Sequence, residues 1–110
     1  MPIDTPNDTL FLTVGSANVI SIALFDSNGD EEDLTGCSDP VILIQTTTGD
    51  DAVGVLTIED ASIVGNKLVH TLTQIQADAL DVGIYYGFVT LTKDGVELKL
   101  RTPFRVEISE

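Results

Sequence analysis

Residues Asp81–Leu91 read D-V-G-I-Y-Y-G-F-V-T-L and form the most aromatic strand that the sequence predicts. Aromatic and β-branched residues favour extended strands. An acidic residue, a glycine and a tyrosine open this strand at two-residue intervals: Asp81, Gly83 and Tyr85. The spacing predicts a structural corner, after which alternate residues point to opposite faces of the strand. The core face would then carry Tyr85 and Gly87, and the other face would carry Ile84, Tyr86 and Phe88.

This corner resembles the one in immunoglobulin-like sandwiches, where the tyrosine hydroxyl bonds back to backbone a few residues upstream. Gly87 occupies the place of the second disulfide cysteine of an antibody domain. Cys37 is the only cysteine and Trp is absent, so no internal disulfide or tryptophan can join the layers. We therefore expect apolar packing alone to hold the fold.

The rest of the chain predicts short strands separated by turns, which is typical of an all-β sandwich. One helical signal interrupts them, because Thr73 and Gln76 have the spacing of a capping box ahead of Ile75–Leu80, with Gly83 as the stop. We predict an immunoglobulin-like antiparallel β-sandwich of seven to eight strands with one short helical crossover. The other predicted strands are Thr9–Val14, Asn18–Phe25, Pro40–Thr47, Ala52–Glu59, Lys67–Thr73 and Val96–Ile108.

The last predicted strand has apolar residues of a single parity on both sides of Pro103. A proline cannot donate a hydrogen bond to a neighbouring strand, so its presence predicts an edge strand. The residues expected to face the core are Val96, Leu98, Leu100, Phe104, Val106 and Ile108.

The chain divides into an extended N-terminal arm, residues 1–8, and one sandwich domain, residues 9–110. The arm has two prolines and little apolar content, and it could order on a neighbouring subunit. No apolar run approaches the roughly 18 residues of a membrane helix. The N-terminus lacks the basic and apolar regions of a signal peptide, so we expect folding in a cytoplasm and no membrane contact.

The net charge of −13 is unevenly distributed. Residues 1–66 hold twelve Asp and Glu and no Lys or Arg, whereas residues 67–110 hold six acidic and five basic residues. Such a charge opposes binding to nucleic acid, whose phosphates are neutralised by Lys and Arg. The acidic half is either a surface that keeps the protein soluble or a face that docks on a basic partner.

The acidic turn after the second predicted strand is a weak candidate for a calcium site. Asp26, Asn28 and Asp30 alternate as oxygen ligands of Ca²⁺ can. The EF-hand template requires Gly at its sixth position and Glu at its twelfth, and those places hold Glu31 and Cys37. We therefore predict a solvated acidic turn and no cofactor.

The sequence does not predict an enzyme. His70 is the only imidazole, and no G-x-S-x-G motif is present. No combination of nucleophile, base and orienting group can be assembled from the residues. His70 is expected to be a core or rim histidine with one hydrogen bond, and Cys37 a partly buried small hydrophobe.

The outward residues Ile84, Tyr86 and Phe88 are the predicted contact surface, since Tyr and Phe are enriched at the centres of interfaces. The alternative is that a loop or the N-terminal arm of the same chain covers them.

Several turn motifs resemble the immunoglobulin-like domains of tailed-bacteriophage virion proteins, notably the N-terminal domain of baseplate upper proteins. They are D-S-N-G-D-E-E-D-L-T-G from Asp26 to Gly36, K-L-V-H-T-L-T from Lys67 to Thr73, and D-V-G-I-Y from Asp81 followed by a K-D-G hairpin. The resemblance covers roughly residues 18–108 and implies no catalytic residues.

It implies a non-enzymatic structural subunit of a virion, folded in the host cytoplasm. The role would be capsid decoration, or a part of the neck, tail or baseplate. The partners would be repeated virion proteins, and a homo-oligomer is a further arrangement to consider. The alternative function is a calcium-assisted adhesion module that binds a carbohydrate or a receptor.

Overall fold

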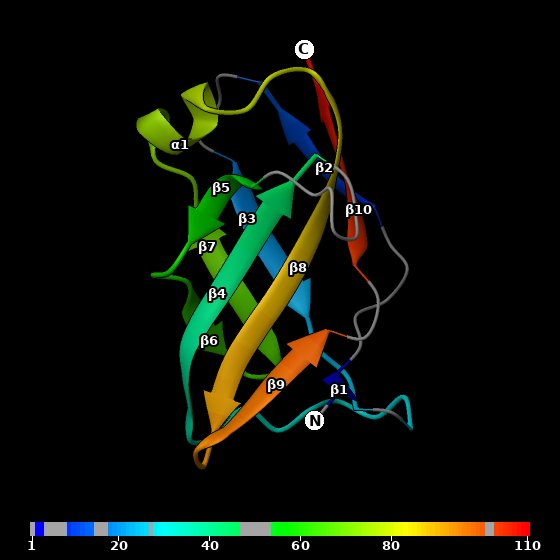
Figure 1. The fold of residues 1–110 in the computed structure, drawn as a ribbon, viewed down its shortest axis with the longest axis vertical. Helices are drawn as coiled ribbons and strands as arrows, with labels where there is room; N and C mark the ends of the chain where they lie inside the picture. Colours follow the sequence, from blue (N-terminus) through cyan, green and yellow to red (C-terminus); the bar gives the residue numbers. More distant parts are fainter. Residues whose placement is uncertain (1, 4–8, 15–17, 27, 47–53, 101–102) are drawn as a thin grey trace.

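The chain folds into two β-sheets packed face to face, with one short helix at an end of the sandwich (Figure 1). The computed structural model describes residues 2–3, 9–14, 18–26, 28–46, 54–100 and 103–110. In Figure 1, β4, β8 and β9 lie in the near layer and β3, β6 and β7 in the layer behind. The predicted all-β sandwich is confirmed.

The larger sheet is built on β8, the predicted aromatic strand. On one side β8 pairs antiparallel with β9 and β10, and on the other with β4, which in turn pairs with β5. Two N-terminal strands add in parallel, β1 on β9 and β2 on β10. The bounds are β1 Pro2–Ile3, β2 Leu10–Thr13, β4 Cys37–Gln45, β5 Gly54–Ile58, β8 Gly83–Lys93, β9 Val96–Leu100 and β10 Phe104–Ser109.

The smaller sheet has three antiparallel strands in the order β3-β7-β6. Their bounds are β3 Val19–Ala23, β6 Ser62–Val64 and β7 Lys67–Thr71. The described residues thus form ten strands, more than the seven or eight that the sequence predicts. The prediction missed β1 and β6, which have only two and three residues. It also took β9 and β10 as one strand and missed the parallel pairings.

The core is formed by alternate residues of both sheets. Ile20 and Ile22 of β3 alternate with more exposed residues and are buried, as is Leu24 beyond the strand. Burying a large aliphatic side chain contributes about 1.5–3 kcal/mol. Side chains that are almost fully buried come from nearly every long strand: Ile20, Leu24, Ile42, Ile44, Ile58, Leu68, Val89, Leu91, Leu98 and Val106.

The Phe104 ring packs directly against the backbone of Gly87 in the core. Gly87 and Phe104 lie directly opposite each other on β8 and β10. A methyl group at Gly87 would lie 2.1 Å from Cζ of Phe104, well inside van der Waals contact. Glycine is therefore needed at position 87 because the ring lies flat against its backbone. This close contact supplies the apolar packing that the sequence predicts around Gly87.

The corner is only partly as predicted. The ring of Tyr85 folds back toward Gly83, where an added Cβ would meet the ring and its hydroxyl oxygen at 3.7–4.0 Å. Tyr85 packs against the core cluster. Its hydroxyl, however, makes no hydrogen bond with any described residue, so the predicted bond to upstream backbone is not formed there.

The predicted capping box is confirmed at the start of α1 (Gln74–Asp78). The Thr73 hydroxyl accepts from the backbone N–H of Gln76 at 3.1 Å, and the Gln76 side chain accepts from the backbone N–H of Thr73 at 3.1 Å. The predicted end was wrong, because α1 ends at Asp78 with Ala79 as its C-cap, and Gly83 instead begins β8. The described part of the chain contains no helix long and apolar enough to cross a membrane.

The predicted edge position of the last strand was wrong. β10 lies between β8 and β2, and β9 lies between β8 and β1, so N-terminal strands cover the side expected to be open. The single parity is confirmed from Leu98 to Ile108, whereas Val96 is exposed at the start of β9. Within the predicted arm, Pro2–Ile3 pairs with β9 of the same chain. Residues 1 and 4–8 lie outside the described residues.

Candidate interaction surface

The face of the larger sheet that points away from the smaller sheet is termed the outer face. On β8, Gly87, Val89 and Leu91 are buried, so the intervening residues point outward. Ile84 is 50 % exposed, and Tyr86 and Phe88 are half-buried. The predicted direction of these three side chains agrees with the structure, although Phe88 also packs against the core cluster.

Cross-strand register extends this line of apolar residues onto neighbouring strands. Leu43 of β4 lies opposite Phe88, and Val41 lies opposite Thr90 in the same sheet. On the far side, Glu107 of β10 pairs with both Ile84 and Phe11. Phe11 is 71 % exposed. The apolar stripe consists of Phe11, Val41, Leu43, Ile84, Tyr86 and Phe88.

The sequence analysis found only the β8 part of this stripe. Val41 and Leu43 belong to a run of four apolar residues, Val41–Ile44, that predicts a strand covered on both faces. Both are half-buried, whereas Ile42 and Ile44 are fully buried. Their place beside Phe88 depends on the β4–β8 register, which the local pattern does not contain.

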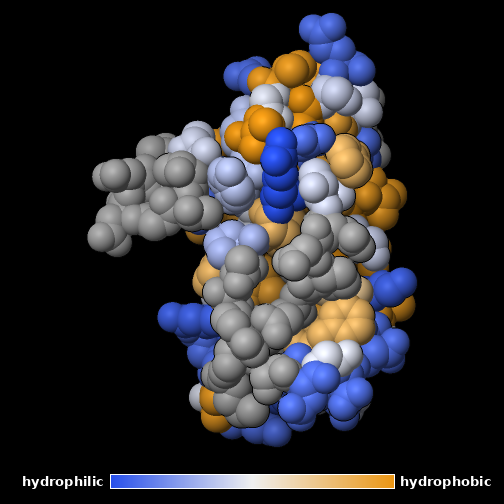
Figure 2. All heavy atoms as spheres, turned by 90° about the vertical axis from the view of Figure 1, so that its right-hand side faces the viewer, coloured by the Kyte–Doolittle hydropathy of each residue, from blue (hydrophilic) through white to orange (hydrophobic). Residues whose placement is uncertain are grey.

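Two ion pairs border the stripe on β9 and β10. The Arg105 guanidinium lies 2.7 Å from the Glu107 carboxylate, and Lys99 Nζ lies 3.0 Å from Glu97. Arg105 of β10 lies opposite Tyr86 of β8, so a cationic and an aromatic residue are cross-strand neighbours on this face. Figure 2 views the sandwich from its β2–β10 edge, where apolar and hydrophilic side chains are interspersed. The outer face therefore combines apolar side chains with balanced charges.

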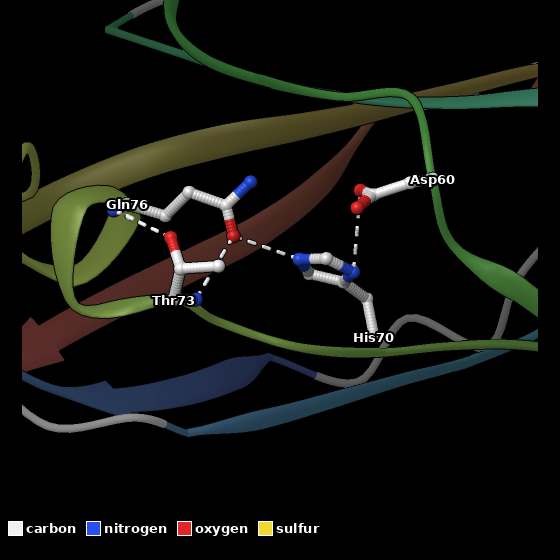
Figure 3. Close-up of polar contacts among 4 residues, drawn as sticks. All are labelled: Asp60, His70, Thr73 and Gln76. Atoms are coloured by element: carbon white, nitrogen blue, oxygen red, sulfur yellow. Dashed lines mark hydrogen bonds and ion pairs between the residues drawn. The ribbon is translucent and has the colours of Figure 1, made fainter.

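The buried histidine is tied to the helix cap (Figure 3). His70 is 8 % exposed, and its Nε2 lies 2.8 Å from Oε1 of Gln76. Because that oxygen also accepts from the Thr73 N–H, Nε2 carries the proton and donates. Nδ1 lies 3.6 Å from the Asp60 carboxylate. These contacts join β7, α1 and the segment before β6. His70 is thus a buried histidine with one hydrogen bond, as predicted.

The acidic turn uses its first carboxylate to order its own backbone. Asp26 Oδ1 accepts from the backbone N–H groups of Asn28 at 2.9 Å and Asp30 at 3.0 Å. Asn28 and Asp30 are exposed. Among the described residues, no three His, Cys, Asp or Glu side chains are grouped as metal ligands would be. Calcium binding at Asp26, Asn28 and Asp30, the weak candidate that the sequence offers, remains an untested alternative to the predicted solvated turn.

Two further groups near the start of β4 have shifted pKa values. The backbone N–H of Thr35 donates to Asp33 Oδ1 at 2.9 Å, and this hydrogen bond lowers the pKa of Asp33. Burial raises the pKa of the Cys37 thiol. Cys37 is half-buried and packs against the core cluster, which confirms its predicted character. A thiol held in its neutral form is a poor nucleophile.

Comparison with known proteins does not identify a family. No family of known proteins matches the chain, and no curated protein matches it. Among solved structures, murine CRIg is similar at 16 % identity and a TM-score of 0.46, over 98 % of this chain and 97 % of that chain. An uncharacterized protein from Bacillus anthracis str. Ames is similar at 17 % identity and a TM-score of 0.43, over 92 % of this chain and 77 % of that chain. The assignment of the fold rests on the two sheets and their register.

Proposed function

We propose that this chain is a non-enzymatic structural subunit of a tailed-phage virion that docks on repeated virion proteins through its outer face. The apolar stripe is the observation that carries the docking role. Exposed apolar side chains that lie together on one sheet face are typical of contact surfaces. The virion setting is supported by the turn motifs shared with immunoglobulin-like phage domains.

The docking contact is expected to be weak when a single copy binds. Full burial of one large apolar side chain contributes about 1.5–3 kcal/mol, and the partly exposed Ile84, Tyr86 and Phe88 have less left to bury. Association also costs several kcal/mol in lost translational and rotational freedom. Repeated copies on a particle offset this weakness, because tethered sites bind with a high effective concentration.

The test uses Ile84→Asp, since Ile84 is exposed in the free protein and its replacement should leave the fold intact. The matched control is Val64→Asp on β6, because Val64 is 57 % exposed and lies on the smaller sheet. The test needs virions of the phage proposed to encode the protein, assembled in the absence of this protein. These virions are mixed with each purified variant and sedimented. We expect the wild type and Val64→Asp to sediment with the particles and Ile84→Asp to remain in solution. Equal binding by Ile84→Asp, or no binding by the wild type, would overturn the proposal.

A further inference from the structure

The larger sheet ends at β2, which has a neighbouring strand on one side only. Among the strands that the structure describes, β2 pairs with β10 and with no other. An unpaired strand edge presents backbone N–H and C=O groups with which another extended segment can pair. Figure 2 views the sandwich from this edge. The free side of β2 is therefore a place where a partner can extend the sheet.

The hydrogen bonds to β10 identify the backbone groups of β2 that stay free. Val14 donates its backbone N–H to the Ser109 carbonyl at 2.8 Å. Alternate residues of a strand direct their backbone groups to the same neighbour, so Phe11 and Thr13, of the opposite parity, direct theirs away from β10. The Thr13 carbonyl accepts from Asn18 Nδ2 at 2.9 Å. The N–H and C=O of Phe11 and the N–H of Thr13 bond to nothing in the described part of the chain.

β2 lacks the features with which proteins usually protect an exposed edge. Those features include a charged residue, a proline and a β-bulge. The strand has the sequence L-F-L-T and pairs with β10 in continuous register from Leu10 to Thr13. Phe11, within this strand, is 71 % exposed. An apolar, uncharged edge of this kind favours pairing with another strand.

We propose that the partner docked on the outer face contributes an extended segment that adds to β2 as a further antiparallel strand of the larger sheet. Antiparallel pairing is the more stable arrangement per residue. The N–H and C=O of Phe11 bond to one residue of this segment, and the Thr13 N–H donates to the carbonyl two residues before it. This inference rests on the proposed docking role and says how the partner binds.

The neighbours of Phe11 indicate that the partner residue beside it is apolar. Phe11 lies opposite Glu107 of β10, and Glu107 lies opposite Ile84 of β8. The Glu107 carboxylate already lies 2.7 Å from the Arg105 guanidinium, so this pair needs no counter-charge from outside. A charged residue of the partner would lose water there without gaining an ion pair. An aromatic or β-branched residue would instead form a cross-strand pair with Phe11 and continue the apolar stripe.

The net charge argues against a second copy of this chain as the source of the added strand. Each copy carries a charge of −13, so two copies repel one another as they approach. The segment is therefore assigned to the virion protein on which the outer face docks.

Phe11→Pro tests strand addition, because proline removes the free N–H and no group that bonds to β10. Proline is tolerated on an edge strand where its nitrogen faces solvent. The matched control is Phe11→Thr, which also removes the ring but keeps the N–H and favours a strand. Each variant is mixed with virions of the phage proposed to encode the chain, assembled in its absence, and sedimentation gives the dissociation constant. We expect Phe11→Pro to bind at least about tenfold more weakly than Phe11→Thr, since a hydrogen bond is lost and a carbonyl of the partner is left unpaired.

Hydrogen exchange of the wild type gives a second readout that does not depend on the folding of a variant. In the free chain, the amides of Phe11 and Thr13 should exchange faster than the amide of Leu12, which faces β10. On the virions, the amides of Phe11 and Thr13 should become protected. Thermal melting shows whether Phe11→Pro folds, and hydrogen exchange decides the matter where it does not.

Equal dissociation constants for folded Phe11→Pro and Phe11→Thr would overturn strand addition. So would Phe11 and Thr13 amides that exchange equally fast in the free and the bound chain. Dimers of the free wild type that Phe11→Pro abolishes would also overturn it, because a second copy would then occupy the edge. If Ile84→Asp loses binding while Phe11→Pro matches Phe11→Thr, the docking surface stands and strand addition fails. A wild type that does not bind the virions would overturn both.

Discussion

Replacing Gly87 by alanine should destabilise the protein more than a single methyl group normally does. Gly87 is buried, and its φ is not in the left-handed region, so the backbone itself would accept alanine. The added Cβ, however, would lie 2.1, 2.3 and 2.6 Å from three atoms of the Phe104 ring. These distances are far below contact, so the whole ring must move out of the core.

The expected cost is near the upper end for overpacking, about 3 kcal/mol. Unfolding entropy is about 2.1 cal/mol/K per residue, which for 110 residues gives a fall in Tm of about 13 °C. Urea denaturation followed by circular dichroism measures the free energy of unfolding, and thermal melting gives Tm. Gly54→Ala is the matched control, because its Cβ would lie 3.4 Å from Leu43 Cδ1, an ordinary contact distance. That variant should stay within about 1 kcal/mol of the wild type.

A double-mutant cycle identifies the ring as the cause. Phe104→Ala alone should cost about 3–5 kcal/mol, since it leaves a cavity in the core. With the ring absent, adding Gly87→Ala should cost less than about 1 kcal/mol, so the two changes would be strongly non-additive. The reasoning is refuted if Gly87→Ala alone lies within about 0.5 kcal/mol of the wild type. Additive effects of the two changes would refute it equally.

Three further predictions concern the helix cap and the acidic loops. Thr73→Ala removes a helix cap and should lower the free energy of unfolding by about 1 kcal/mol. Gln76→Ala should lower it further, because this change also leaves the buried His70 N–H without its acceptor. Equal losses of unfolding free energy in urea denaturation would contradict this. Asp33 has a lowered pKa in the folded state, so its contribution is present above the unfolded pKa and is lost as the pH falls through the folded value. In Asp33→Asn, Tm should therefore fall less steeply below about pH 4 than in the wild type. The same fall of Tm with pH in both proteins would argue against the Asp33 hydrogen bond. Asp26→Ala should lower Tm, because two hydrogen bonds of the turn are lost. Saturating Ca²⁺ should not shift the Tm of the wild type. A Ca²⁺-dependent rise in Tm that vanishes in Asp26→Ala would instead support the calcium-assisted adhesion module.

The sequence predicts individual strands and the helix start well, because the patterns that indicate them involve residues close together in the chain. The alternation of Ile20, Ile22 and Leu24, the capping box at Thr73 and the outward direction of Ile84 all depend on residues within a few positions of one another. The same patterns correctly predict a two-layer β fold held without a disulfide.

What the sequence does not predict depends on register and on distant pairing. The parallel strands β1 and β2 turn the last strand from an edge into an interior position, and no pattern around Pro103 indicates this. The same holds for the candidate surface. Its β8 residues follow from alternation, but the addition of Leu43 and Phe11 depends on pairings between strands far apart in the chain. The contact between Phe104 and Gly87 likewise depends on the register between β8 and β10.

The central claim is that the outer face of the larger sheet is the contact surface, and the affinity of one pair of variants tests it most directly. Ile84→Asp and Val64→Asp place the same charge at similarly exposed apolar positions on opposite sheets. Binding of each to immobilised virions of the phage proposed to encode the chain gives two dissociation constants. We expect Ile84→Asp to bind at least about tenfold more weakly than Val64→Asp, a difference of about 1.4 kcal/mol. Equal dissociation constants, or weaker binding by Val64→Asp, would contradict the account.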